Sequence, residues 1–321
     1  MAKESMRAAI LTGPGQAEVT ELPRPLPAAG QVRVKIEGCG VCGSNLSLWE
    51  GRPWFQYPRE PGAPGHEGWG VIDRVGANVP ESLIGQRVAM LSYRAFAEYD
   101  IADAQQVVPL PASLAEQPFP GEALGCVMNI FRRSQLRPGQ NVAIVGAGFL
   151  GAALVQLTAG AGARPIAISR RSYALDVAAQ AGAALTIPMR DHKQIIDQVM
   201  EATSGRGCEV VIEAVGEQWP LDLAGELTAE RGRLVIAGYH QDARSVNMQL
   251  WNWRGLDVIN AHERAPEAYV SGMRDAVSAV ETGKLDPTPL YTHSFPLAEL
   301  SIALSGLKER PEGMLKTWVT P

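Results

Sequence analysis

The stretch Val142-Ala143-Ile144-Val145-Gly146-Ala147-Gly148-Phe149-Leu150-Gly151 decides the fold of this chain. Its first four residues are apolar and rich in β-branched side chains, which is typical of a buried strand. The glycines form a G-x-G-x-x-G pattern between that strand and a following segment of helical character. This context, and not the glycines alone, predicts the turn of a dinucleotide-binding βαβ unit.

Each residue of the turn has its own physical task in that prediction. Gly146 permits the tight turn, Gly148 lets the backbone approach a pyrophosphate, and Gly151 allows the helix to pack closely on the strand. Phe149 and Leu150 begin the helix, where backbone N–H groups and the positive dipole end attract an anion. A glycine-rich turn without a ligand is the alternative interpretation.

The end of the next expected strand distinguishes between the two nicotinamide dinucleotides. An enzyme that prefers NAD usually has Asp or Glu there, which binds the ribose hydroxyls. This chain has Ile168-Ser169-Arg170-Arg171 instead. Ser169 can donate a hydrogen bond to a 2′-phosphate, and Arg170 can pair with its charge. The sequence therefore predicts NADP, with NAD as the alternative, although two solvated arginines at a helix start would also explain the pattern.

Residues 142–163 also have the length of a transmembrane span, because these 22 residues carry no charge. Five of them are glycines, and the β-branched residues gather in the first part of the segment. A strand, a glycine turn and a helix of small residues explain this distribution better than a membrane span does. We therefore expect no membrane association.

The rest of the chain divides into two kinds of pattern. Strands alternate with helices after the glycine turn, which predicts a doubly wound parallel Rossmann sheet. Before it, short strand-like runs are separated by Gly- and Pro-rich turns, which predicts an irregular antiparallel β domain. We expect an α/β protein whose catalytic domain comprises residues 1–128 and 266–321, with a nucleotide-binding domain of residues 129–265 inserted between them.

Length and composition agree with a two-domain enzyme. The 321 residues are 46% hydrophobic and 20% charged, so the chain can bury large cores. A net charge of −5 excludes a strongly basic nucleic-acid-binding protein. Four cysteines do not make a disulfide scaffold, and residues 1–6 are followed by no apolar stretch typical of a secretory signal. These features predict a cytoplasmic protein.

Four residues, Cys42, His66, Glu67 and Glu122, carry chemistry suited to a catalytic zinc ion. A thiolate, an imidazole and carboxylates can supply three protein ligands and leave an exchangeable fourth position. A lone cysteine or histidine is more often a core residue. The layout of these residues in short motifs is what makes the combination specific.

The motifs give the chain a resemblance, over essentially its whole length, to the zinc-dependent medium-chain dehydrogenase/reductase superfamily, nearest to its polyol and secondary-alcohol dehydrogenases. Gly40-Val41-Cys42-Gly43-Ser44 resembles the first-ligand motif, and Gly65-His66-Glu67 resembles the second. The resemblance implies a GroES-like catalytic domain with Cys42 and His66 as zinc ligands. It further implies that Glu67 is a ligand that yields to water or substrate, and that Ser44 supplies the hydroxyl of a proton relay.

Two cysteines leave the ligand set open to alternatives. Glu122-Ala123-Leu124-Gly125-Cys126 resembles the stretch that carries the third ligand. Glu122 lies 24 residues before Gly146, a spacing that suits the polyol dehydrogenases, so we prefer it to Cys126, which the alcohol branch of the family would favour. Cys39 forms a C-x-x-C with Cys42, for which a redox pair is a further interpretation.

The same resemblance extends the cofactor site. Glu213-Ala214-Val215-Gly216 resembles the loop that approaches the nicotinamide ribose, which implies contacts from Ala214, Val215 and Gly216. Gly238 lies in the turn after the next strand, and Lys316 falls where the family often has a basic residue near the cofactor pyrophosphate.

The chain departs from the family pattern at three places. The four-cysteine structural zinc lobe is missing between residues 87 and 99, so one zinc ion per chain is expected. Asn45 stands where an aspartate usually supports the metal, which should weaken the tuning of its electrostatics. Ser47 replaces a relay histidine, which leaves the exit path of the proton open.

The implied activity is hydride transfer between NADP(H) and an alcohol or polyol, or its ketone or aldehyde, as in alcohol dehydrogenases of the EC 1.1.1 type. Four aromatic residues near the ligands, Trp49, Trp54, Phe55 and Tyr57, are expected to line the substrate pocket or to form a loop core. A homodimer or homotetramer is expected through an edge strand at residues 256–259. The rival hypotheses are a zinc-free NADPH-dependent quinone or enone reductase of the same superfamily and a non-catalytic NADP-binding protein.

Overall fold

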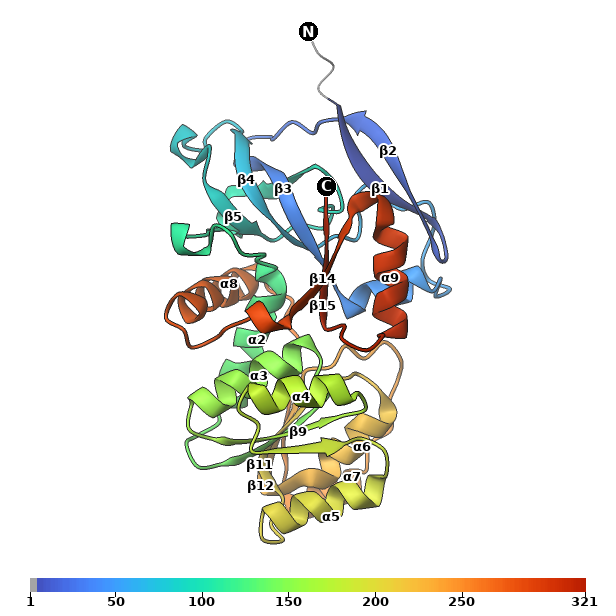
Figure 1. Ribbon diagram of the computed structural model, residues 1–321, viewed down its shortest axis with the longest axis vertical. Helices are drawn as coiled ribbons and strands as arrows, with labels where there is room; N and C mark the ends of the chain where they lie inside the picture. The colour runs from blue at the N-terminus through green and yellow to red at the C-terminus, as the bar shows by residue number, and fades with distance from the viewer. Residues whose placement is uncertain (1–4) are drawn as a thin grey trace. The chain divides into compact units, whose positions relative to one another are not determined.

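The computed structural model describes residues 5–321, which form two compact units (Figure 1). The first unit comprises residues 5–125, Arg264–Glu281 and Tyr291–Pro321. The second unit comprises Cys126–Glu263 and Thr282–Leu290. Most of the N-terminal stretch that argued against a secretory signal, residues 1–4, lies outside the described residues.

The second unit is built on a six-stranded parallel sheet in the order β10-β9-β8-β11-β12-β13. Its strands are β8 (Asn141–Val145), β9 (Arg164–Ser169), β10 (Leu185–Pro188), β11 (Cys208–Glu213), β12 (Thr228–Ile236) and β13 (Asp257–Asn260). The chain moves outward from β8 to β10 and then returns to β11 on the other side of β8. This order confirms the predicted doubly wound sheet, with its topological switch point between β8 and β11.

Crossover helices connect these strands, as parallel pairing requires. They are α3 (Phe149–Gly160), α4 (Ser172–Gln180), α5 (His192–Ala202), α6 (Gln218–Leu227) and α7 (Met248–Arg254). One core cluster of the unit consists of apolar side chains from the sheet, α5 and α6, among them Val145, Ile168, Val199, Val211 and Leu223. The strands are apolar on both faces because helices cover both.

The uncharged segment 142–163 forms β8, the glycine turn and α3, as predicted. Every residue of β8 is buried, and most of α3 is buried as well. The apolar character of the segment is therefore explained by its place inside the unit. Along the described chain, no helix combines the length and the apolar character that a membrane crossing needs.

The first unit contains a seven-stranded sheet in which β14, β15, β3, β4, β5 and β7 follow one another and β6 pairs with β3. These strands are β3 (Gln31–Val41), β4 (Glu67–Val75), β5 (Arg87–Met90), β6 (Tyr99–Asp103), β7 (Val107–Pro109), β14 (Tyr291–Pro296) and β15 (Lys316–Thr320). All pairings are antiparallel except that of β14 with β15. The C-terminal strand β15 thus lies beside β3, which brings the end of the chain into the N-terminal sheet.

Smaller elements complete the first unit. An antiparallel pair is formed by β1 (Ser5–Gly13) and β2 (Gln16–Pro23). The helices are α1 (Leu46–Trp49), α2 (Gly121–Ser134, whose later residues belong to the second unit), α8 (Pro266–Glu281) and α9 (Leu300–Glu309). Short 3₁₀ turns lie at η1 (Gly43–Asn45), η2 (Glu81–Leu83), η3 (Ala104–Gln106), η4 (Ala112–Leu114), η5 (Thr288–Leu290, of the second unit) and η6 (Leu297–Glu299). This mixture of short strands and turns is the GroES-like domain that the sequence predicted.

Candidate active site

Three of the predicted metal ligands, Cys42, His66 and Glu67, lie together in the first unit. Their ligand atoms (one Sγ, one ring nitrogen and one carboxylate oxygen) all lie within 4.8 Å of one another. Cys42 follows β3 directly, and His66 and Glu67 stand at the start of β4. Because β3 and β4 are antiparallel neighbours, the end of one strand meets the beginning of the other.

Backbone carbonyls and one amide side chain orient these ligands. The Nδ1–H of His66 donates to the Pro64 carbonyl at 2.8 Å, which leaves Nε2 as the atom that can bind a metal. The Oδ1 of Asn45 accepts the Cys42 N–H at 3.0 Å, while its Nδ2 donates to the same Pro64 carbonyl at 3.4 Å. Asn45 therefore ties the cysteine turn to the histidine turn without adding a charge.

The predicted relay serine lies beside the same imidazole. The Oγ of Ser44 is 3.4 Å from Nε2 of His66. The Oγ of Ser47, which is buried, donates to the Ser44 carbonyl at 3.4 Å. Ser47 therefore supports the backbone of Ser44, while the Ser44 hydroxyl lies beside the cluster.

A buried ion pair completes the cluster. The Nζ of Lys316 contacts Oε2 of Glu67, and the two side chains are only 5% and 1% exposed. Gly40 lies opposite Glu67 in the sheet, and a β-carbon on Gly40 would lie 1.8 Å from Oε2 of Glu67. The absence of a side chain at Gly40 is what leaves room for the carboxylate.

The electrostatic field at the cluster favours cations. Burial by itself would lower the pKa of the His66 imidazole. Cys42, Glu122 and Glu67 outweigh burial and raise this pKa to about 10. Burial likewise opposes the charge on Lys316, but the anionic groups around it raise its pKa. A site that retains protons this strongly is also suited to a divalent metal ion.

Glu122 stands apart from the three clustered ligands. It lies buried in the first turn of α2, and its charge acts on both His66 and Lys316. Among the described residues it does not fall within the 4.8 Å group, so its role as the third ligand stays a prediction. The half-buried rival Cys126 lies one helical turn further along α2.

The remaining cysteine of the motif behaves as a core residue. Cys39 is fully buried, and its Sγ is 3.6 Å from the Gly40 carbonyl. Burial, reinforced by the charge of Glu67, raises the pKa of its thiol well above the usual value. A thiol that does not ionise is a poor partner for a redox pair with Cys42.

A short loop takes the place of the missing structural lobe. The chain passes from β5 to β6 through residues 91–98, and Phe96 is fully buried. The N–H of Ala95 donates to the Gly65 carbonyl at 2.9 Å, and the N–H of Phe96 to the Gly62 carbonyl at 3.1 Å. The loop therefore supports the turn that carries His66.

Most of the predicted pocket aromatics pack into the core of the first unit. Trp49 is buried in this core, and Phe55 and Tyr57 are partly buried and pack against the core cluster. Trp54 is 56% exposed and lies beside Arg52, whose guanidinium carbon is 5.7 Å from the ring centroid. The loop-core interpretation therefore describes three of the four rings.

The glycine turn of the second unit has the predicted shape. Gly146 has a φ of +104°, and its N–H donates to the Ile168 carbonyl at 2.8 Å. A β-carbon on Gly151 would lie 1.9 Å from the Gly146 carbonyl oxygen, so the helix could not pack this closely with any other residue. Gly148 stands at the N-cap of α3, and Phe149 and Leu150 form its first turn.

The end of β9 presents the residues predicted to choose between NADP and NAD. Ser169 is buried, and its Oγ lies 3.5 Å from the N–H of Arg171. Arg170 is exposed at the strand end. The residues at this strand end, Ser169-Arg170-Arg171, include no Asp or Glu, so no carboxylate among them would repel a 2′-phosphate.

The loop after β11 packs against the glycine turn. A β-carbon on Gly146 would lie 2.6 Å from Cγ2 of Val215, and the Ala214 N–H donates to the Val145 carbonyl at 2.8 Å. Gly238 lies close to the same loop: a β-carbon added to Gly238 would be only 2.2 Å from the Gly216 nitrogen. The structure therefore brings together the predicted residues after β8, β11 and β12.

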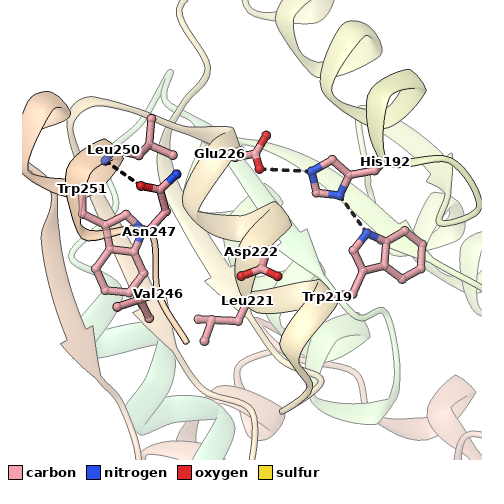
Figure 2. A pocket seen from close by; sticks show the side chains of 9 residues that line it. All are labelled: His192, Trp219, Leu221, Asp222, Glu226, Val246, Asn247, Leu250 and Trp251. Carbon is pink, nitrogen blue, oxygen red and sulfur yellow. Dashed lines mark hydrogen bonds and ion pairs between the residues drawn. The ribbon is translucent and has the colours of Figure 1, made fainter. Parts of the chain in front are cut away.

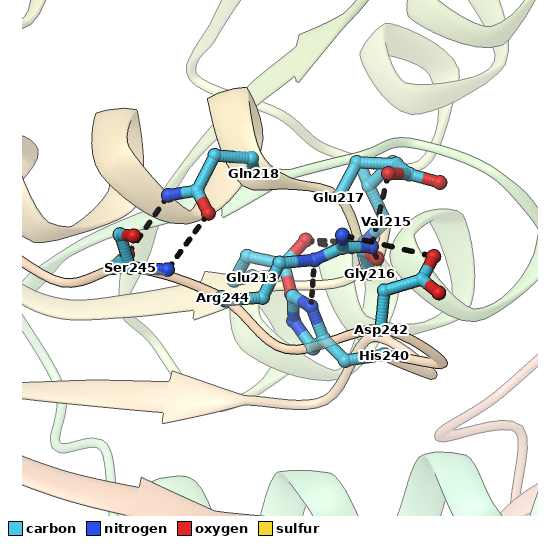
Figure 3. Close-up of polar contacts among 9 residues, drawn as sticks. All are labelled: Glu213, Val215, Gly216, Glu217, Gln218, His240, Asp242, Arg244 and Ser245. Atoms are coloured by element: carbon cyan, nitrogen blue, oxygen red, sulfur yellow. Dashed lines mark hydrogen bonds and ion pairs between the residues drawn. The ribbon is translucent and has the colours of Figure 1, made fainter.

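Sequence reasoning missed two residues beside this loop, His240 and Arg244. Figure 3 shows them on the loop after β12, next to the buried Glu213. Their only sequence signal is that they follow Gly238 closely, and no motif marks them. Their proximity to Glu213 arises from the parallel pairing of β11 with β12.

A hollow of about 460 Å³ lies elsewhere on the second unit, among α5, α6 and α7 (Figure 2). The indole N–H of Trp219 donates to Nδ1 of His192 at 2.7 Å, and Nε2 of His192 lies 3.2 Å from Glu226. Since an indole can only donate, His192 is a neutral imidazole that joins two helices. None of the predicted site residues lines this hollow. Its lining residues are His192, Trp219, Leu221, Asp222, Glu226, Val246, Asn247, Leu250 and Trp251.

Comparison with known proteins agrees with this geometry. The family model for the alcohol dehydrogenase GroES-like domain matches residues 28–112, and that for the zinc-binding dehydrogenase matches residues 150–278. A zinc-type alcohol dehydrogenase-like protein of Haemophilus influenzae is 25% identical over 98% of both chains. The chain belongs to the medium-chain dehydrogenase/reductase superfamily. It is therefore a member of a family of zinc-type alcohol dehydrogenase-like oxidoreductases.

Solved structures share the fold of the whole chain. The alcohol dehydrogenase RspB of Escherichia coli CFT073, in complex with NADH, has a TM-score of 0.88 at 23% identity and covers 99% of this chain and 100% of its own. A zinc-binding dehydrogenase of Sinorhizobium meliloti bound to NADP has a TM-score of 0.84 at 25% identity, covering 99% of both chains. Superfamily members of this fold thus bind either nicotinamide dinucleotide, which supports a nicotinamide cofactor for this chain.

The Gly40–Glu67 contact predicts the effect of adding one methyl group. Gly40→Ala should displace the Glu67 carboxylate, and we expect the chelator-washed variant to bind Co²⁺ at least about tenfold more weakly. The thiolate-to-cobalt absorption band in a Co²⁺ titration measures this affinity. Gly43→Ala is the matched control, because a β-carbon there meets no atom within 4 Å. Equal affinities of the two variants would contradict the assigned role of Gly40.

Proposed function

We propose that this protein is a zinc-dependent oxidoreductase that transfers hydride between NADP(H) and an alcohol or polyol, or the matching ketone or aldehyde. The observation that carries the proposal is the cluster of Cys42, His66 and Glu67 with a serine hydroxyl beside Nε2 of the imidazole. A thiolate, an imidazole and a carboxylate suit Zn²⁺, and they leave room for a further ligand.

The residues that would hold the ion are Cys42, His66 and Glu122, with Glu67 as an exchangeable ligand. When bound, Zn²⁺ supplies a Lewis acid that stabilises negative charge on the substrate oxygen. Lys316 offers the Glu67 carboxylate a second partner, so that Glu67 keeps a counter-charge when substrate takes its position.

The chain's own residues move the proton in this proposal. Ser44 would accept the proton of the substrate hydroxyl as it passes its own hydroxyl proton on toward the cofactor ribose and solvent, since its Oγ lies 3.4 Å from Nε2 of His66, a predicted metal ligand. The Ser47 hydroxyl, at the place of the relay histidine of relatives, donates to the Ser44 backbone carbonyl and would steady the position of Ser44. The proposed catalytic groups are therefore Ser44 and Glu67.

The cofactor is proposed to bind along the carboxyl ends of the parallel strands. The N-terminus of α3 would receive the pyrophosphate, and Ser169 with Arg170 would receive a 2′-phosphate. The nicotinamide ribose would meet the loop of Ala214, Val215 and Gly216. Lys316 is proposed as a pyrophosphate contact in addition to its pairing with Glu67. The remaining proposed cofactor-binding residues are Gly146, Gly148, Phe149, Leu150, Gly151 and Gly238.

Domain roles, assembly and location complete the proposal. We propose residues 1–128 and 266–321 as the catalytic domain and residues 129–265 as the cofactor-binding domain; of these, residues 126–128 and Thr282–Leu290 belong to the second compact unit. β13 is an edge strand of the parallel sheet, and its open side can pair with a second copy to form a homodimer or homotetramer. Trp253, on α7 shortly before β13 in the chain, is 88% exposed. We propose that the enzyme acts in the cytoplasm.

The metal content of the purified protein tests the proposed chemistry. We expect about one zinc ion per chain after a mild chelator wash, and at least about 10³-fold lower turnover of alcohols or ketones in Cys42→Ala. Elemental analysis and steady-state kinetics measure the two quantities. Cys126→Ala serves as the control and should keep both the metal and the activity. Zinc-free wild type that still reduces quinones or enones would replace this proposal with the zinc-free reductase.

The choice of NADP is tested at Arg170. Arg170→Ala should raise the KM for NADPH by about tenfold through loss of a charge-assisted contact, while the KM for NADH stays unchanged. Arg164→Ala, at an exposed arginine that begins β9 at the opposite edge of the sheet, is the control and should change neither value. A wild-type enzyme with a higher kcat/KM for NADH than for NADPH would show that the cofactor is NAD.

A further inference from the structure

A buried carboxylate holds the loop that follows β11. Glu213 is fully buried at the end of this strand. Its Oε1 accepts the backbone N–H groups of Val215 at 2.7 Å and Gly216 at 2.8 Å. One carboxylate oxygen therefore fixes two successive peptide groups of the loop.

The other oxygen of Glu213 is bound by a histidine whose tautomer is determined by its neighbours. Nε2 of His240 lies 2.9 Å from Oε2 of Glu213, and Nε of Arg244 lies 3.2 Å from Nδ1 of His240. A guanidinium can only donate, so Nδ1 must accept and Nε2 must carry the hydrogen. His240 therefore accepts a hydrogen bond from Arg244 and donates one to Glu213, so the position of Arg244 fixes the imidazole that binds Glu213.

Arg244 also binds the loop directly and closes a ring of hydrogen bonds (Figure 3). Its Nη2 donates to the Gly216 carbonyl at 2.8 Å and to Glu217 at 3.0 Å. The ring runs from the Gly216 N–H through Glu213, His240 and Arg244 to the Gly216 carbonyl. The backbone N–H and the backbone carbonyl of Gly216 are thus both held by the same closed network.

The loop held in this way lies at the switch point between β8 and β11. Val215 and Ala214 pack against Gly146 of the glycine turn, and Gly238 packs against Gly216. In parallel α/β sheets, the ligand binds at this position, outside the carboxyl ends of the strands. A small rotation of the peptide at Gly216 would therefore change the surface that this loop offers to a ligand and leave the glycine turn itself in place.

We propose that His240 and Arg244 are positioning residues that hold the loop of Ala214, Val215 and Gly216 for the nicotinamide ribose, and thereby set the affinity for that half of the cofactor. The inference rests on the proposed cofactor site. Neither residue needs to touch the cofactor, because each acts through Glu213 or through the Gly216 carbonyl.

Binding measurements on the two halves of the cofactor test this inference. We expect His240→Ala and Arg244→Ala to weaken binding of the preferred dinucleotide by about tenfold each. Binding of the matching adenosine fragment should stay within about twofold of wild type. The fragment is adenosine 2′,5′-bisphosphate if wild type prefers NADPH, and AMP if it prefers NADH. Isothermal titration calorimetry measures all these dissociation constants without turnover or metal.

A conservative variant and a structural control separate positioning from general stability. His240→Gln keeps one donor and one acceptor in a neutral side chain, so it should restore most of the dinucleotide affinity. Arg254→Ala removes hydrogen bonds from another arginine of the same unit to the Glu226 and Thr228 carbonyls. It should lower the melting temperature without changing the ratio of the two affinities.

The outcomes distinguish the inference from the proposed function. Equal weakening of dinucleotide and fragment, or no weakening of either, would overturn the positioning role while the cofactor site stands. If His240→Gln does not recover dinucleotide affinity, this would also contradict the inference that His240 acts through one donated and one accepted hydrogen bond. Wild-type protein that binds neither dinucleotide would instead overturn the proposed function, on which the inference rests.

Discussion

The register of three strands in the first unit determines the candidate metal centre. Gly40 of β3 lies opposite Glu67 of β4, and Val41 lies opposite Thr317 of β15. This register brings together residues that are separated by more than 200 positions in the sequence, including Cys42 and Lys316. A shift of one residue would turn the side chains of a strand to the opposite face of the sheet and disperse the cluster.

The burial of charge in this cluster has a cost that the cluster itself offsets. Removing Glu67 and Lys316 from water disfavours their charged forms, and each supplies the counter-charge that the other needs. The surplus of acceptors around His66 then favours an additional cation. Neutral Asn45 holds the turns in place through hydrogen bonds, so the supporting geometry of the centre does not depend on an aspartate at this position.

The second unit uses a buried carboxylate in a different way. Among residues 5–321, no lysine or arginine lies directly on the oxygens of Glu213, which bind two backbone N–H groups and one imidazole. Such bonds have fixed directions, so they determine the conformation of a loop more closely than a flexible ion pair does. The same residue type thus takes part in a candidate ligand set in one unit and organises a loop in the other.

The sequence by itself determined the fold class and most local elements. The alternation of β-branched runs with helices predicted the parallel sheet, and the context of Gly146, Gly148 and Gly151 predicted a turn that the backbone confirms. These features follow from local physics, since strand patterns and glycine turns depend on residues near one another in the chain. Cys42, His66 and Glu67 were also identified from short motifs.

Only the tertiary structure decided which partners these residues have. Lys316 pairs with Glu67, and His240 and Arg244 join Glu213, because β15 lies beside β3 and β12 lies beside β11. Neither partnership leaves a local pattern, since the pairing of distant strands is set by the packing of the whole unit. The position of Glu122 relative to the three clustered ligands likewise depends on how α2 packs, and sequence spacing alone does not contain that information.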